Sequence, residues 1–206
     1  EARRLFEATD TMQRIRLVRE GRLSLAGSME KLGLRQKDGQ WWRGRHGAPT
    51  THILKWAPSE LPDLNLNELC CLELLRAVGL PVAEAFIVGH QVPVLAVRRF
   101  DRRDDDAVET IHQEDFCQAL GVEPALKYQA EGGPSLAQCA EVIRRHCAVP
   151  ARELGQLLRW ALANYLLGNG DGHGKNLALL YGPDGLRLAP CYDVACTLAY
   201  EGLSRK

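Results

Sequence analysis

The strongest constraint on this chain is a polar, glycine-rich loop followed by a second acidic turn. The loop reads Leu167-Gly168-Asn169-Gly170-Asp171-Gly172-His173-Gly174-Lys175-Asn176, and Cys191-Tyr192-Asp193 follows it. Asp171 and Asn176 have the Asp-x4-Asn spacing of a kinase catalytic loop, in which the Asp orients or deprotonates the attacking hydroxyl. The Asn and a later Asp then hold magnesium, an ion that prefers oxygen ligands. Asp193 is the candidate for the later carboxylate.

Three other interpretations of the loop compete with this one. A dinucleotide-binding fingerprint would need glycine at position 173 after Gly168 and Gly170, and that position is His173. An EF-hand loop starting at Asn169 would place Leu180 where a glutamate ligand is needed. An ordinary surface loop rich in Gly, Asn and Asp stays open.

Composition sets limits on the class of protein. With 206 residues, the chain is long enough for one large domain or two small lobes, and its 46% hydrophobic content supports a proper core. The net charge of zero gives no overall electrostatic footprint for nucleic acid. Apolar runs end before membrane-spanning length, and the first residues do not begin a signal peptide, so no membrane contact is expected. The seven cysteines are odd in number and include no Cys-x-x-Cys pair, which predicts reduced core thiols and a cytoplasmic protein.

The first half of the chain predicts strands and one clear helix. A short helix within residues 1–20 leads into a strand, turn and strand over residues 21–34. Gly27 and its flanking serines would let backbone N–H groups approach an anion closely, although a simple hairpin turn explains the same residues. A strand over residues 50–56 carries Lys55, which would grip nucleotide phosphates in a kinase but would reach solvent in an ordinary strand.

The clearest amphipathic helix spans residues 64–78 and is ended by Gly79. Glu68 or Glu73 on this helix would pair with Lys55, and the order along the chain favours Glu68. Strands over residues 82–88 and 92–99 follow. The residues expected on the buried side of the helix are Leu66, Leu69, Cys70, Leu72, Leu74, Leu75 and Val78.

The second half of the chain predicts helices. They are expected near residues 113–120, 136–146 and 151–167, with strands over 177–181 and 186–189 between the glycine-rich loop and the turn that carries Asp193. The predicted fold is α+β with two kinase-like lobes. A β-rich N-lobe with one helix covers residues 1–99, a hinge covers 100–103, and a mainly helical C-lobe covers 104–206. Ligands favour a cleft of this kind.

Several stretches together resemble HipA-type kinases, which are bacterial serine/threonine kinases and typically toxins of toxin–antitoxin pairs. The resemblance runs from about Leu23 to Ala199. Its motifs include Leu23-Ser24-Leu25-Ala26-Gly27-Ser28-Met29-Glu30-Lys31, Thr51-His52-Ile53-Leu54-Lys55, Leu95-Ala96-Val97-Arg98-Arg99-Phe100-Asp101-Arg102 and Gln113-Glu114-Asp115-Phe116-Cys117-Gln118. They also include Lys127-Tyr128, Gly132-Gly133-Pro134, the Gly168-to-Asn176 loop and Leu188-Ala189-Pro190-Cys191-Tyr192-Asp193.

The resemblance implies a role for each matching residue. Asp171 would be the catalytic base, with His173 and Lys175 beside it in the catalytic loop. Lys175 would steady the transferred phosphoryl group. Asn176 and Asp193 would bind Mg²⁺. The ATP site would be formed by Ser24, Ala26, Gly27, Ser28, Lys55, Arg99, Phe100 and Asp101.

The resemblance also implies regulation and partners. Ser24 matches a serine whose autophosphorylation inactivates the family, and a phosphate there adds about −1.5 to −2 charge beside the ATP phosphates. The protein substrate would be an aminoacyl-tRNA synthetase, and the partner a helix-turn-helix antitoxin through which any DNA contact is made. The family is also associated with persistence.

The chain departs from the family pattern in three respects. Ser28-Met29 stands where Ala-Gln is frequent, and Arg98 stands where the hinge is often acidic. The chain also lacks the family's N-terminal subdomain and the helices after the Asp193 turn. We therefore expect either a partial chain or a short family branch in which a separate small protein supplies the N-terminal subdomain.

Two alternatives to a toxin kinase remain at this point. A small-molecule kinase of the aminoglycoside or choline type also uses Asp-x4-Asn and a later Asp, but the Ser24 loop argues against it. A non-catalytic kinase-like module could instead serve only to bind an antitoxin.

Overall fold

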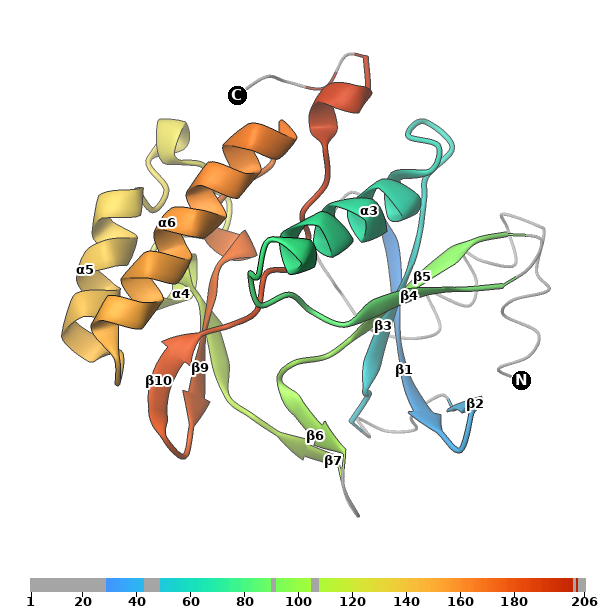
Figure 1. Ribbon diagram of the computed structural model, residues 1–206, viewed down its shortest axis with the longest axis horizontal. Helices are drawn as coiled ribbons and strands as arrows, with labels where there is room; N and C mark the ends of the chain where they lie inside the picture. The colour runs from blue at the N-terminus through green and yellow to red at the C-terminus, as the bar shows by residue number, and fades with distance from the viewer. Residues whose placement is uncertain (1–28, 43–48, 90–91, 105–107, 202, 204–206) are drawn as a thin grey trace. The chain divides into compact units, whose positions relative to one another are not determined.

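The computed structural model of the protein describes residues 29–42, 49–89, 92–104, 108–201 and 203. These residues form two units, one containing residues up to 70 and 83–110, the other containing residues 71–82 and those from 111 onward (Figure 1). The predicted helix within residues 1–20 and the glycine–serine turn at 24–28 lie outside the described residues.

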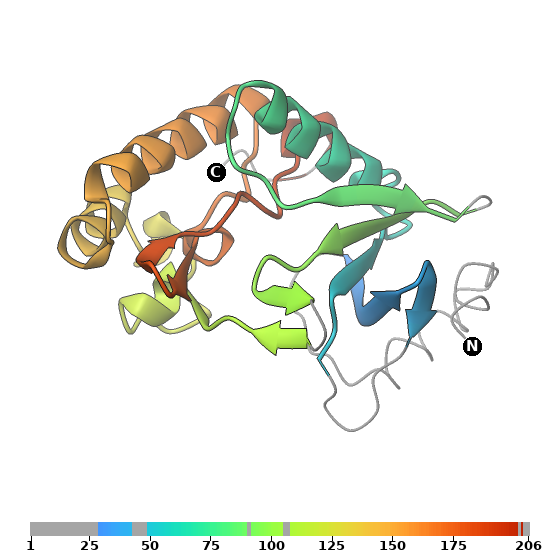
Figure 2. The same ribbon diagram turned by 60° about the horizontal axis from the view of Figure 1, so that its bottom comes forward.

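The first unit is built on an antiparallel sheet of five strands in the order β2-β1-β3-β5-β4 (Figure 2). The hairpin between β1 and β2 turns at Asp38 and Gly39, whose φ values of 51° and 71° are the positive pair that a tight two-residue turn requires. A separate hairpin pairs β6 with β7. The strands are β1 Glu30–Lys37, β2 Gln40–Trp42, β3 His52–Trp56, β4 Ala85–Val88, β5 Val94–Arg98, β6 Arg102–Asp104 and β7 Val108–Thr110.

Three predicted strands of this unit are confirmed with adjusted ends. The strand expected over residues 50–56 is β3, and the one over 92–99 is β5. The strand expected over 82–88 begins only at Ala85, because Val82 instead forms an isolated bridge with Cys191. The core of the sheet consists of Leu32, Leu34, Leu54, Trp56, Val94 and Ala96.

Helix α3 spans Leu64–Ala77, which confirms the predicted helix, but the predicted buried side is wrong in four positions. Leu66, Cys70, Leu74 and Val78 are exposed. The apolar residues of this helix are distributed over more than one of its faces, so their periodicity alone does not predict which face is buried. Packing selects the face that carries the buried residues Leu64, Asn65, Glu68, Cys71, Leu72 and Leu75.

The second unit combines two long helices with a three-stranded antiparallel sheet in the order β10-β9-β8. Helix α5, Leu136–His146, has the predicted bounds and begins with a capping box between Ser135 and Gln138. Helix α6, Pro150–Leu167, confirms the helix expected over 151–167, with proline in its first turn. The strands are β8 Gln113–Asp115, β9 Ala178–Gly182 and β10 Gly185–Leu188, and three short 3₁₀ turns lie at Gln129–Glu131, Gly174–Asn176 and Thr197–Ala199.

One predicted helix of this unit is partly wrong. Residues 113–115 were expected to be helical, but they form β8 and pair with β9. The helix proper, α4, is confined to Phe116–Ala119. Asp115 sits at the junction and caps α4 by accepting a hydrogen bond from the backbone N–H of Gln118, so the capping residue marks where the strand ends.

Most of the thiols are buried in the second unit. Cys71, Cys117, Cys139, Cys147 and Cys191 are buried, and all seven cysteines of the chain are free thiols. The core of the unit is formed by residues such as Leu75, Phe116, Ile143, Trp160, Leu179 and Val194. Among the described helices, none has the length and apolar character needed to span a membrane.

Candidate active site

The predicted partner of Lys55 is found in the first unit. Lys55 Nζ lies 2.5 Å from Glu68 Oε1, and the two side chains are only 3% and 1% exposed. Next to Glu68 on α3, Asn65 Nδ2 donates to the carbonyl of Pro93 at 2.8 Å and fixes the helix to the end of β5. The pairing with Glu68 rather than Glu73 is therefore confirmed, and β3 and α3 together hold one lysine in a buried position.

The predicted hinge residues contain a second charged cluster in the same unit. The carboxylate of Asp101, which is 5% exposed, accepts hydrogen bonds from Arg99 at 2.7 Å and from Arg102 at 2.6 Å. Burial lowers the pKa of Arg102, and the neighbouring charge of Arg99 lowers it further. Arginine donors thus contact both oxygens of the Asp101 carboxylate. Phe100, which lies between Arg99 and Asp101 in the sequence, is partly buried.

In the second unit, the predicted catalytic loop begins where α6 ends. Gly168 has φ 67° and caps α6 in the left-handed region, and a Cβ at this position would lie 2.5 Å from a side-chain carbon of Leu198. Beyond it, the loop is fixed by the buried Asn164 of α6, whose backbone and side-chain oxygens both accept hydrogen bonds from Asn169. Asn169 Oδ1 in turn accepts from the N–H of Asp171 at 3.1 Å.

Thr197 anchors the same loop from the C-terminal side. Its hydroxyl oxygen accepts from the N–H of Gly170 at 2.7 Å, and its hydroxyl donates to the carbonyl of Gly168 at 3.1 Å. The backbone that leads into Asp171 is therefore held by contacts from α6 and from the turn at Thr197–Ala199.

Three groups converge on one oxygen of the Asp171 carboxylate. The hydroxyl of Tyr128 donates a hydrogen bond to Oδ1. Lys127 Nζ lies 3.9 Å from the same oxygen, and His173 Nε2 lies 3.7 Å from it. The Asp171 side chain is nevertheless 46% exposed. One face of the carboxylate is thus held by the protein while the group remains accessible.

His173 and Asn176 form the buried side of the loop. Burial lowers the pKa of His173, against the opposing effect of the Asp171 charge. The N–H of His173 donates to Asn176 Oδ1 at 3.2 Å, which fixes the orientation of the carboxamide.

Asp193 lies in a turn that is joined to this loop. It has φ 51°, a left-handed conformation that is uncommon outside glycine. Its neighbour Tyr192 donates from its hydroxyl to the carbonyl of Lys175 at 2.7 Å. This bond joins the two segments one residue away from each predicted magnesium ligand, Asn176 and Asp193. No cluster of three His, Cys, Asp or Glu side chains suited to a metal occurs among the described residues.

Lys175 is paired with a residue to which sequence reasoning gave no role. Its Nζ lies 2.6 Å from Asp115 Oδ2, and the two side chains are 25% and 14% exposed. Asp115 therefore caps α4 with Oδ1 and accepts a hydrogen bond from Lys175 with Oδ2.

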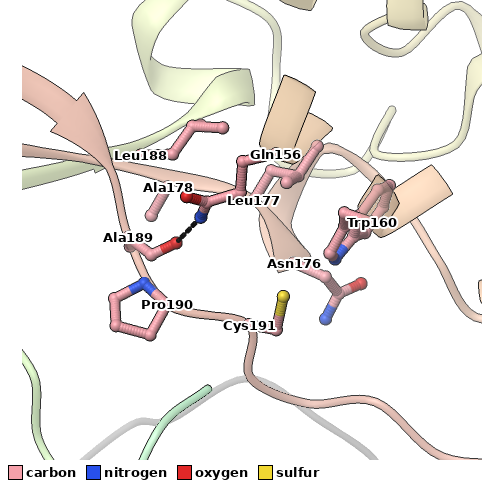
Figure 3. Close-up of a pocket in the computed structure, with 9 residues that line it drawn as sticks. All are labelled: Gln156, Trp160, Asn176, Leu177, Ala178, Leu188, Ala189, Pro190 and Cys191. Atoms are coloured by element: carbon pink, nitrogen blue, oxygen red, sulfur yellow. Dashed lines mark hydrogen bonds between the residues drawn. The ribbon is translucent and has the colours of Figure 1, made fainter. Parts of the chain in front are cut away.

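A small pocket lies behind the loop, between α6 and strands β9 and β10. Figure 3 shows Gln156 donating from Nε2 to the carbonyl of Ala189, a bond of 3.1 Å, in the wall of this pocket. The lining is mostly apolar and reaches Asn176, so the carboxamide stands at the border between the core and the loop. The remaining lining residues are Trp160, Leu177, Ala178, Leu188, Pro190 and Cys191.

The predicted site residues are thus distributed over the two units. Asp171, His173, Lys175, Asn176 and Asp193 belong to the second unit, whereas Lys55, Arg99, Phe100 and Asp101 belong to the first. Ser24, Ala26, Gly27 and Ser28 lie outside the described residues. Sequence reasoning gave no role to the supporting residues Asn164, Thr197, Asp115 and Tyr128, although Asp115 and Tyr128 stand in stretches that resemble the family.

Comparison with known proteins gives a consistent result. The family model described as HipA-like C-terminal domain matches residues 23–205. The chain is 46% identical over 188 residues to Y4mE of Sinorhizobium fredii, whose name describes a candidate kinase; the match covers 90% of this chain and 45% of that protein. It is 31% identical over 201 residues to the serine/threonine-protein kinase toxin HipA of Shewanella oneidensis, with 90% and 46% covered.

Two solved structures resemble the fold. The complex of Shewanella oneidensis HipA, HipB and operator DNA matches with a TM-score of 0.81 and 31% identity, over 91% of this chain and 47% of that one. The Helicobacter pylori proinflammatory kinase CtkA matches with a TM-score of 0.57 and 16% identity, over 82% and 55%. The predicted kinase-like α+β fold is confirmed. The chain spans about half the length of the relatives it matches.

Proposed function

Because the chain belongs to the HipA-like C-terminal domain family, we propose that it is the core of an ATP- and Mg²⁺-dependent serine/threonine protein kinase that acts as a toxin. The observation that carries this proposal is the state of Asp171. Its carboxylate is exposed to an incoming group, and one oxygen is held by Tyr128. A general base needs both accessibility and a fixed orientation toward the proton that it accepts.

The residues of the second unit suit the proposed chemistry. Asp171 accepts the proton of the attacking hydroxyl. Asn176 and Asp193 offer oxygen donors, the ligand type that magnesium prefers, on two segments that the Tyr192 bond joins. When bound there with ATP, magnesium would neutralise charge on the transferred phosphoryl group. Lys175 is a further source of positive charge in the same loop, although it is now paired with Asp115.

The first unit supplies the nucleotide-binding residues of the proposal. Lys55 would contact the ATP phosphates, since Glu68 holds its ammonium group in a fixed place. Arg99, Phe100 and Asp101 would line the adenosine site. Ser24, Ala26, Gly27 and Ser28 would form the phosphate loop, with Ser24 as the site of inactivating autophosphorylation.

The proposed antitoxin partner is supported by one relative. The Shewanella oneidensis HipA structure contains HipB and operator DNA. We therefore propose that a helix-turn-helix antitoxin binds this protein and that any DNA contact is made through that antitoxin. The proposed protein substrate is an aminoacyl-tRNA synthetase, and the proposed supplier of an N-terminal subdomain is a separate small protein.

Intact-mass spectrometry after incubation with ATP and Mg²⁺ tests the proposal. We expect the wild type to gain one phosphate on Ser24 and Asp171→Asn to gain none. Asp184→Asn makes the same chemical change in an exposed turn and should behave as the wild type. If Asp171→Asn gains phosphate at the wild-type rate, Asp171 is not the base. If the wild type gains none, begins with unmodified Ser24 and still binds the antitoxin, the non-catalytic alternative is correct.

A further inference from the structure

The segment around Tyr128 is a tightly closed loop. The carbonyl of Tyr128 accepts hydrogen bonds from the N–H groups of Glu131 and Gly133, both at 2.9 Å. A Cβ at Gly133 would lie 2.4 Å from the carbonyl oxygen of Leu126 and 2.8 Å from that of Tyr128. Only glycine allows the chain to pass this close to itself. The local sequence therefore fixes the backbone that carries Tyr128.

This segment is also joined to the catalytic loop. The N–H of Gly174 donates to the carbonyl of Lys127 at 3.1 Å. A Cβ at Gly174 would lie 2.7 Å from the ring of Pro134, so the two glycine-bearing stretches pack directly against one another. The ring of Tyr128 meets that of His173 edge to face, with 5.1 Å between their centroids. Backbone, glycine and ring contacts thus hold Tyr128 in place relative to Asp171.

The two oxygens of Asp171 differ in what surrounds them. Oδ1 accepts from the Tyr128 hydroxyl and lies near Lys127 and His173. Within the part of the chain that the structure describes, Oδ2 has no hydrogen-bond partner. A hydroxyl that approaches Asp171 therefore meets an available acceptor at Oδ2 without displacing Tyr128.

We propose that Tyr128 is a positioning residue for phosphoryl transfer, whose hydroxyl holds Oδ1 of Asp171 so that Oδ2 faces the acceptor hydroxyl. This inference rests on the proposed function. In the step itself, the acceptor hydroxyl gives its proton to Oδ2 and its oxygen bonds to the γ-phosphorus. The bond from that phosphorus to the bridging oxygen breaks, and ADP leaves with the electron pair.

Tyr128 keeps its own proton throughout this step. Burial raises the pKa of its phenol well above the ordinary value, and the adjacent Asp171 carboxylate raises it further. The hydroxyl therefore remains a donor to Oδ1 at neutral pH. Its role is to fix the carboxylate, and the role of base stays with Asp171.

The rate of phosphate transfer as a function of ATP concentration, measured for Tyr128→Phe in the full protein, tests this role. We expect the maximal rate to fall about 10- to 100-fold, because misplacing a reacting group by about 1 Å costs up to about 10²-fold. The ATP concentration at half-maximal rate should stay within about twofold, since the variant alters the base and leaves Lys55 intact. Tyr181→Phe, which removes a hydroxyl donated to Glu114, should match the wild type in both quantities.

A second measurement separates the possible outcomes. NMR of tyrosines labelled with ¹³C at Cζ should show the Tyr128 signal shifting between wild type and Asp171→Asn while that of Tyr181 stays in place. This comparison does not use Tyr128→Phe, so it remains valid even if that variant fails to fold.

The results identify which claim fails. If the wild type transfers phosphate, Asp171→Asn does not, and Tyr128→Phe transfers within twofold of the wild type, the positioning role is overturned and the proposed function stands. A Tyr128 ¹³C signal that is the same in wild type and Asp171→Asn also overturns it. If the wild type transfers no phosphate at all, the proposed function fails, and the inference that rests on it fails as well.

Discussion

Removing one member of the buried Lys55–Glu68 pair should destabilise the protein strongly. The two charged groups are 2.5 Å apart and almost fully enclosed, with 3% and 1% of their side chains exposed. Glu68→Ala removes the carboxylate that pairs with the buried ammonium group of Lys55. Breaking a buried ion pair by removing one partner costs about 3–5 kcal/mol, because that carboxylate no longer offsets the desolvation of the remaining ion.

The magnitude can be measured by thermal or urea unfolding. For a chain of this size, each kcal/mol shifts Tm by about 2–4 °C, so Glu68→Ala should lower Tm by roughly 6–20 °C. Glu84→Ala provides a matched control in the same unit. It breaks the Arg98–Glu84 pair, whose side chains are 50% and 67% exposed, and should cost less than about 1 kcal/mol.

A double variant separates stability from function. Lys55→Met with Glu68→Leu replaces both charges by apolar groups and should be close to the wild type in stability or above it. It should nevertheless transfer no phosphate, since the proposed contact with ATP phosphates is lost. A cost below about 1 kcal/mol for Glu68→Ala, or a double variant as unstable as the single one, would refute the desolvation argument. A stable double variant that still transfers phosphate would refute the role of Lys55.

Three further predictions concern the second unit. Glu153→Ala removes the buried carboxylate that accepts a hydrogen bond of 3.0 Å from the Leu188 N–H. The free energy of unfolding, measured in urea, should fall by about 1–3 kcal/mol. An unchanged urea midpoint would show that this hydrogen bond does not contribute to stability. Gly174→Ala should lower the free energy of unfolding by about 1–3 kcal/mol and slow phosphate transfer, because the new Cβ meets the ring of Pro134. If this variant transfers phosphate at the wild-type rate, the ring of Pro134 can move to accommodate the methyl group. Burial raises the pKa of the Cys139 thiol from its ordinary value of 9.0 to about 12. The contribution of the neutral thiol to stability is therefore full below pH 9 and is lost as pH rises toward 12. The urea midpoint of Cys139→Ala should fall less steeply with pH above pH 9 than that of the wild type, and equal pH slopes would show that this thiol does not cause the loss of stability.

Two of the three helices expected in the second unit, α5 and α6, have bounds within one residue of those expected. The capping pair Ser135 and Gln138 marks the start of α5, and Pro150 and Gly168 mark the two ends of α6. These signals act within one turn of the backbone that they satisfy, so they can be recognised without knowledge of the rest of the fold. The pairing of Lys55 with Glu68 was also predicted, because the order of elements leaves few candidates.

Signals that depend on tertiary packing were not available from the sequence. Leu66 and Leu74 were expected to be buried on α3 but are exposed, whereas Glu68 is buried because Lys55 compensates its charge. The polar residues 113–115 become strand β8 because β9 offers them a partner. In both cases, a contact with a distant segment decides the outcome against the local pattern.

The same distinction explains why the glycine-rich loop was singled out from the sequence while the residues that support it were not. Asp171 and Asn176 stand in one short stretch with a fixed spacing, so a single chain reveals them. The supporting groups come from elsewhere: Tyr128 holds the carboxylate, Asp115 holds Lys175, and Tyr192 joins the loop to the Asp193 turn. Each contact joins the loop to a residue at least 17 positions away in the sequence. A loss of the Tyr128 hydroxyl would therefore leave the Asp-x4-Asn motif unchanged while removing the group that holds the proposed base, and the sequence alone would still predict a kinase.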